Sequence, residues 1–252
     1  IETIPTQIED HKEFVKKRHD AKKKTARSKD DEKVYHETGL TGSFGEIVSI
    51  AWAVDDQPVQ AVYRTSLEEG TERALLHKFA TILKGQINHH STKTENRILY
   101  QPKMWIGHRV KDFDLRFLQQ RFIVNKLDPQ IDFYLDKKDG IFDTMHAWAG
   151  YKSNAMVSLA ELCQALGIPV KSNGLDGSKV WEAVVEGRFK EIAEYNCEDV
   201  EATRAVFNNL TFRNAIPFDN AQSFEDDIEI IVRGGEIKHD LAGMSLDDSF
   251  GI

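Results

Sequence analysis

The sequence has few cysteines and no long apolar run. Only two cysteines, Cys163 and Cys197, occur among the 252 residues, and neither has a CxxC-type neighbour, which argues against a disulfide scaffold or a zinc ribbon. The longest apolar runs, such as residues 47–54, fall far short of the roughly 20 residues that a membrane-spanning helix needs. No signal-peptide pattern opens the chain. We therefore expect a cytoplasmic protein that contacts no membrane.

Net positive charge is also absent. The chain has 33 Lys and Arg against 41 Asp and Glu, a formal net charge of -8. Non-specific coating of nucleic acid needs a basic face, so this balance argues against such a role. It does not exclude a nuclease, because metal-binding carboxylates are themselves acidic and substrate contact can be confined to one basic strip. Residues 11–29 contain nine Lys and Arg, and form either a solvated charged face or an element that contacts phosphates.

The apolar pattern is typical of an α/β domain. Two β-rich runs, residues 46–54 and 59–65, flank a turn and predict a hairpin. Leu75, Leu76, Phe79, Ile82 and Leu83 have the spacing of an amphipathic helix. Further strands are predicted at residues 104–107 and 141–145, and further helices at residues 114–125, 159–166, 178–186 and 189–210. This alternation implies a mixed sheet covered by helices.

Three acidic residues occur where burial is expected. Glu2 ends the first strand, Asp114 lies at the start of a predicted helix, and Asp199 lies late in another. A buried carboxylate is costly unless it is paired or bound to a metal. Tyr195 precedes Asp199 by four residues, which places the two about 40° apart on one helix face. Singly these patterns are typical of a helix cap or a surface pair, but together and in this order they indicate a site for chemistry.

The segments around these acids resemble the DEDD exonuclease superfamily, in its tyrosine-containing branch, which has a ribonuclease-H-like fold. Residues 1–5 (IETIP) are similar to the family's first motif, Asp-Ile-Glu-Thr-Ile-Pro, without its aspartate. Residues 113–118 (FDLRFL) and 195–199 (YNCED) are similar to the second and third motifs, and residues 142–145 and 166–171 to the stretches between them. The closest likeness is to stand-alone domains related to the proofreading exonuclease of family B DNA polymerases. The resemblance implies an α/β fold with a mixed five-stranded sheet flanked by helices.

The same resemblance implies a 3′→5′ exonuclease that uses two Mg²⁺ or Mn²⁺ ions, hard cations that carboxylate oxygens suit. Glu2 and Asp199 would hold the ion on the nucleophile side, and Asp114 would serve the other. An aspartate expected directly before Ile1 would bridge both ions. Tyr195 would orient the attacking water through its hydroxyl, because an unperturbed pKa of about 10 makes it a poor anionic base.

Three residues are assigned to substrate binding. The backbone of Thr3 would meet the terminal 3′-hydroxyl. Arg109 belongs to the pair His108-Arg109, which stands where the family usually carries an asparagine before the second acid. Lys171 lies near the inferred site, either as a substrate contact or as an exposed loop lysine. His146 is also near, and we interpret it as a structural histidine.

The resemblance covers residues 1 to about 210. We expect an exonuclease domain over residues 1–212, with a basic insertion at about residues 10–38, and an acidic tail over residues 213–252. A central strand cannot consist of the first four residues alone, so we expect residues upstream of Ile1, with an engineered removal as the other reading.

The expected substrate is a single-stranded DNA 3′ end, because the closest resemblance is to DNA-polymerase proofreading domains. A role in DNA replication or repair would then need a polymerase or replication partner, since no polymerase domain is recognised in the sequence. Two alternatives stay open. One is an RNA 3′ exonuclease on the same scaffold, which a contact to the 2′-hydroxyl would reveal. The other is a non-catalytic nucleic-acid-binding or adaptor module that lacks the first aspartate.

Overall fold

The structure is a computed structural model that describes residues 1–23, 31–87, 91–93, 98–135, 140–150, 152–169 and 175–215. The chain divides into a compact unit of Ile1–Arg213 and a second unit of Asn214–Ile252. The second unit, with the strand-like stretch of residues 224–233, lies almost wholly outside the described residues. The helices and strands of the described residues belong to the first unit.

A three-stranded antiparallel sheet forms the centre of this unit. Its strands are β1 (Glu2–Ile4), β2 (Glu46–Trp52) and β3 (Gln60–Tyr63), hydrogen bonded in that order. Ser49 of β2 pairs with Tyr63 of β3, which confirms the predicted hairpin. Six of the seven residues of β2 are buried, as expected for a strand covered on both faces.

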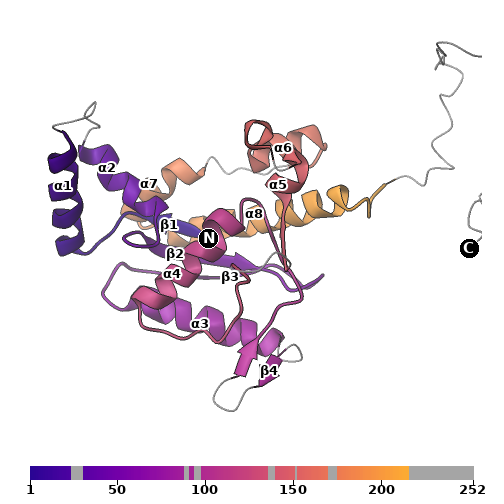
Figure 1. The fold of residues 1–252 in the computed structure, drawn as a ribbon, viewed down its shortest axis with the longest axis horizontal. Helices are drawn as coiled ribbons and strands as arrows, with labels where there is room; N and C mark the ends of the chain where they lie inside the picture. Colours follow the sequence, from indigo (N-terminus) through magenta and orange to yellow (C-terminus); the bar gives the residue numbers. More distant parts are fainter. Residues whose placement is uncertain are drawn as a thin grey trace, which may run out of the picture. The chain divides into compact units, whose positions relative to one another are not determined.

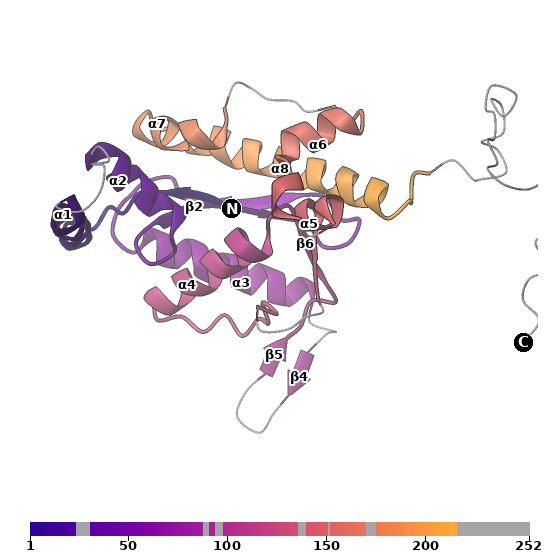
Figure 2. The ribbon, with the colours of Figure 1, turned by 45° about the horizontal axis from the view of Figure 1, so that its top comes forward.

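Helices cover both faces of this sheet (Figure 1 and Figure 2). On one face lies α3 (Thr71–Gln86), whose apolar stripe includes the buried Leu76 and Phe79. On the other lie α7 (Val180–Val185) and α8 (Phe189–Leu210), which bury apolar side chains against Ile4 and Val48. Burial of one large apolar side chain stabilises the fold by roughly 1.5–3 kcal/mol, so these two clusters hold the helices on the sheet.

A separate parallel pair of strands stands beside the central sheet. β6 (Trp105–Gly107) pairs with β7 (Ile141–Asp143), with Gly107 opposite Asp143. The predicted mixed α/β domain is confirmed, but the prediction of one five-stranded sheet is not, since no ladder joins these two strands to β1, β2 or β3 within the described residues. The reason is length: β1 and β6 have three residues each, which leaves little backbone for a ladder between them.

Two local features differ from the sequence predictions. No strand was predicted in the polar stretch of residues 86–97, but it contains β4 (Ser91–Lys93), which pairs with β5 (Ile98–Tyr100). β4 is wholly exposed, so it carries no alternating apolar signal. The strand predicted to run to residue 145 ends at Asp143, because that carboxylate caps α5 (Thr144–Ala149) by accepting hydrogen bonds from its first turn.

The basic segment is helical in its described part. α1 (Glu9–Lys23) and α2 (Asp31–Glu37) form there, and residues 24–30 lie outside the described residues. None of the described helices combines the length and the apolar character of a membrane span. The other helical elements are α4 (Arg116–Val124), α6 (Leu159–Ala165) and the short turns η1 (Thr38–Leu40), η2 (Lys111–Leu115), η3 (Ser153–Ala155) and η4 (Gly177–Lys179).

A buried ion pair joins α3, α4 and β2. The Glu72 carboxylate accepts hydrogen bonds from Arg121 Nε at 2.9 Å and Nη2 at 2.6 Å, from the Ile47 backbone N–H at 2.8 Å, and from Asn125 Nδ2 at 2.9 Å. Both charged side chains are almost completely buried. The pair therefore sets how α4, which follows the second motif, lies on the sheet.

Replacing Arg121 with methionine should strongly destabilise the protein. The change leaves the Glu72 carboxylate buried without a counter-charge, which costs about 3–5 kcal/mol. Urea unfolding would measure the loss, and adding Glu72→Gln should recover part of it because the uncompensated charge is then gone. A double variant no more stable than Arg121→Met would contradict this account.

Candidate active site

The predicted catalytic residues come from three elements of the first unit. Glu2 lies on β1, Asp114 lies in η2 just before α4, and Tyr195 and Asp199 lie one turn apart on α8. A buried hydrogen bond of 3.1 Å from Asn196 Nδ2 to Ser49 Oγ joins this part of α8 to β2. The site is thus built on sheet and helix rather than on loops alone.

The first strand meets the second motif at its start. The backbone nitrogen of Ile1 is almost completely buried and lies 2.7 Å from Asp114 Oδ1. The charges of Asp114 and Asp199 both act on Glu2, so the three acids lie within electrostatic reach of one another. Figure 2 shows this end of the chain at the sheet, between α4 and α8.

The surroundings of Glu2 and Asp199 disfavour the ionised form of both carboxylates. Burial, followed by the charges of Asp199 and Asp114, raises the pKa of Glu2 to about 8, although the ammonium of Ile1 works against the shift. Burial also raises the pKa of Asp199 to about 6, against the effects of the ammonium and of a hydrogen bond from Tyr195. A nearby positive charge stabilises the ionised form of acids in such surroundings. The cluster is thus disposed to bind a cation.

The donor atoms fit a hard divalent ion, but the arrangement is not a preformed metal cluster. Carboxylate oxygens are the ligands that Mg²⁺ and Mn²⁺ prefer. In the described part of the chain, however, no three His, Cys, Asp or Glu side chains lie close enough together to hold an ion. Glu2, Asp114 and Asp199 therefore have the chemistry of metal ligands without a closed coordination geometry.

The Tyr195 phenol lies within the electrostatic influence of Asp199. Burial, together with the charges of Asp199 and Glu2, raises the pKa of the Tyr195 phenol further above its ordinary value. The hydroxyl consequently stays protonated at neutral pH. It can donate or accept a hydrogen bond, but it cannot serve as an anionic base.

Asp143, which our sequence analysis did not assign to the site, organises the turn before Asp114. Its carboxylate accepts hydrogen bonds from the backbone N–H groups of Arg109 at 2.9 Å and Lys111 at 3.4 Å, as well as from the first turn of α5. His108 contributes a second link through Thr144 Oγ1 at 3.0 Å. Asp143 lies inside the strand predicted at residues 141–145, and its residue type, which commonly caps helices, was the available signal.

Arg109 adopts an unusual backbone conformation. Its φ of 59° is in the left-handed region, which asparagine tolerates better than other non-glycine residues. The side chain is exposed, and the backbone N–H is held by Asp143. Arg109 thus borders the second motif, with its guanidinium in solvent.

Of the remaining residues near the predicted site, Thr3 and His146 lie in the described part of the chain. Thr3 Oγ1 donates to the Gly39 carbonyl at 2.7 Å, which fixes the first motif to η1. A Cβ on Gly39 would lie 3.0 Å from the carbonyl carbon of Ile4, so glycine permits this close approach. His146 Nε2 lies 3.3 Å from a carboxylate oxygen of Asp112, as suits a structural histidine. Lys171 lies outside the described residues.

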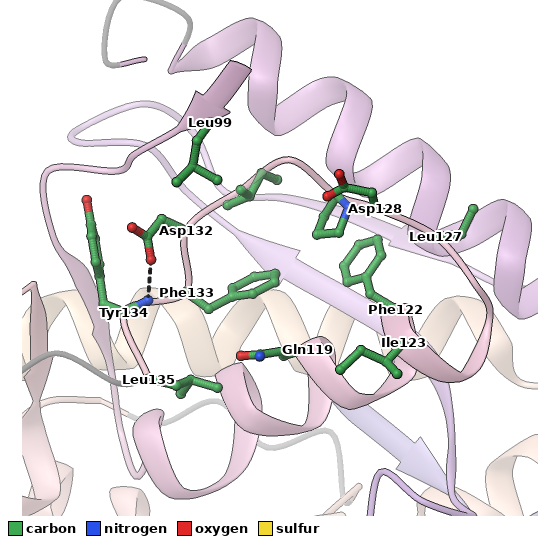
Figure 3. Close-up of a pocket in the computed structure, with 12 residues that line it drawn as sticks. Leu99, Gln119, Phe122, Ile123, Leu127, Asp128, Asp132, Phe133, Tyr134 and Leu135 are labelled. Atoms are coloured by element: carbon green, nitrogen blue, oxygen red, sulfur yellow. Dashed lines mark hydrogen bonds between the residues drawn. The ribbon is translucent and has the colours of Figure 1, made fainter. Parts of the chain in front are cut away.

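A large pocket lies away from these acids. It has a volume of about 700 Å³ and is formed by α4 and the loop after it, with Phe122, Phe133 and Leu135 in its lining (Figure 3). Tyr134 donates its backbone N–H to Asp132 at its edge. None of the predicted catalytic residues lines it. The acids, and not this pocket, form the candidate active site, because the chemistry of the side chains is a better guide to an active site than the size of a cavity.

Comparison with known families identifies the family of the chain. Residues 40–234 match a family described as predicted 3′-5′ exonucleases related to the exonuclease domain of PolB. The chain belongs to this family. The matched range, well over half of the chain, contains Asp114, Tyr195 and Asp199 and begins after Glu2 and Thr3. The search of curated proteins found no match. Membership of this family supports exonuclease activity as a prediction, and it assigns no role to individual residues.

Proposed function

We propose that this protein is a metal-dependent 3′→5′ exonuclease that removes nucleotides from the 3′ end of single-stranded DNA. The observation that carries the proposal is the approach of Glu2, Asp114 and Asp199, from β1, η2 and α8, to within electrostatic reach of one another, with the start of β1 2.7 Å from Asp114. The match to predicted 3′-5′ exonucleases supports the direction of cleavage. The relation of that family to a DNA polymerase domain supports DNA over RNA, and a polymerase or replication protein as a partner.

The acids would hold two Mg²⁺ or Mn²⁺ ions. When bound, such ions supply a nucleophile at neutral pH and neutralise charge on the phosphate. Glu2 and Asp199 would hold one ion and Asp114 the other, and an aspartate directly before Ile1 would complete the set. Such a residue would also remove the charge of the Ile1 ammonium, since the amino group becomes part of a peptide bond.

The remaining residues position the substrate and water. The protonated Tyr195 hydroxyl, next to Asp199, would orient the attacking water. The backbone of Thr3, held by Gly39, would meet the terminal 3′-hydroxyl. Arg109 and Lys171 would contact phosphate. Exposed basic residues of α1, such as Arg18, would bind further along the strand, although Lys17 is paired with Glu13.

The proposal predicts release of nucleotides from a labelled 3′ end only with a divalent ion. The test uses a chain with an aspartate directly before Ile1, and single-stranded DNA labelled at either end. We expect activity with Mg²⁺ or Mn²⁺, none with excess chelator, and recovery when the ion is restored. Cleavage from the 5′ end, or full activity in chelator, would overturn the assignment. RNA of the same sequence is the matched control, and equal or faster cleavage of it would favour the RNA exonuclease.

A further inference from the structure

The outer edge of the three-stranded sheet is open in the described structure. β3 is last in the order β1-β2-β3, and no described strand pairs with its other side. An open edge presents backbone N–H and C=O groups to any strand that can approach it. α8 packs against β3, the strand that forms this edge, and against β2.

The register shows which residues of β3 face outward. Arg64 donates its backbone N–H to the Val48 carbonyl at 2.9 Å, and Val62 is opposite Ile50 two residues away. Hydrogen-bonded pairs alternate along an antiparallel ladder, so Val62 is directed to β2 as Arg64 is. Ala61 and Tyr63 therefore direct their N–H and C=O groups away from β2, toward the open edge.

The same two residues form one wall of a groove. Ala61 and Tyr63 face α8 across a space of about 280 Å³, and Ala193 and Cys197 form part of its other wall. A strand added to β3 would direct every second side chain into this groove, because side chains alternate between the faces of a sheet. Backbone pairing and side-chain recognition are thus available at one place.

The α8 wall of the groove is acidic. Glu194, Glu198 and Glu201 line it, at a spacing that places them on one side of the helix. Lys190 pairs with Glu194 at 3.2 Å, which leaves a net negative charge. One carboxylate oxygen of Glu198 is buried without a hydrogen-bond partner within the described residues. Such a group is costly to leave unmatched, so the groove favours a ligand that brings hydrogen-bond donors and positive charge.

We propose that β3 and this acidic groove bind an extended segment of a partner protein that carries Lys or Arg at alternate positions. The segment would add to the sheet at Ala61 and Tyr63 and direct its basic side chains to Glu198 and its neighbours. A nucleic acid is disfavoured because its phosphates would face the glutamates. A second copy of the chain would bring the same acidic helix, and like charges would oppose the contact.

A short labelled peptide of alternating Lys and Val tests the proposal by fluorescence anisotropy with the full chain. We expect it to bind, and a Glu and Val peptide to bind at least about tenfold more weakly. Methylation of the peptide's backbone amides should also weaken binding about tenfold or more, because the charges remain while strand pairing is lost. This comparison uses the unaltered protein, so it does not depend on the folding of a variant.

Matched variants locate the site. The triple change Glu194→Gln, Glu198→Gln and Glu201→Gln should weaken the Lys and Val peptide at least about tenfold. Glu191→Gln, a change on the same helix outside the groove, should leave binding unchanged, since Glu191 pairs with Arg188. Equal binding by the methylated peptide or by the triple variant would overturn the proposal. So would a stable dimer in sedimentation that excludes the peptide.

Discussion

Asp199→Asn is expected to lower kcat by about a thousandfold or more and to weaken metal binding, whereas Tyr195→Phe lowers kcat alone. Asp199 is one of three acids whose charges act on one another, so the asparagine removes negative charge from a site that would hold divalent ions. A thousandfold loss corresponds to about 4 kcal/mol of transition-state stabilisation. Tyr195→Phe deletes one hydroxyl and keeps the ring, so its cost should be about 10- to 1,000-fold.

The measurement is a Mn²⁺ titration of activity and of calorimetric binding for both variants and the parent protein. Glu198→Gln is the matched control, because it removes a carboxylate next to Asp199 that lines the groove at β3. Its turnover should stay close to that of the parent. If Tyr195→Phe shifts the metal midpoint as far as Asp199→Asn does, the positions of metal and water around α8 are wrong.

The residue placed directly before Ile1 is expected to decide whether the protein is active. An aspartate there should give metal-dependent cleavage, and an alanine there should leave activity at least about a thousandfold lower, as expected for loss of a metal ligand. Either residue converts the Ile1 ammonium to a peptide nitrogen, so both remove the charge that now contacts Asp114. Only the aspartate replaces it with an additional carboxylate for the ions.

The two chains should be compared by turnover and by calorimetric binding of Mn²⁺, each with the same short extension before the tested residue. An asparagine at this position keeps the shape of aspartate but removes its charge. It should therefore behave like alanine if the residue is a metal ligand. Equal turnover with aspartate and alanine would show that the first motif is misaligned. The non-catalytic reading of the fold would gain support if none of the three chains cleaved DNA.

Much of the fold was predictable because its signals are local. The apolar residues of β2 and the turn before β3 predicted the hairpin, and the spacing within α3 predicted its buried face. The exposed strand β4 was missed because it buries nothing and so has no apolar period. The five-stranded sheet was expected from the resemblance, but joining β6 to β1 depends on a backbone ladder that short strands do not form here.

The sequence by itself determined the chemical nature of the site. It placed Glu2 in the first strand, Asp114 at the start of a helix and Asp199 within a later helix. It also put Tyr195 one turn before Asp199, because helix periodicity follows directly from residue spacing. Only the tertiary structure decided which groups meet from distant segments. It assigned Asp143 to the turn before Asp114, and it brought Ala61 beside an acidic face of α8. The physical reason is that a hydrogen bond or a groove between segments far apart in sequence arises from packing, which no local pattern encodes.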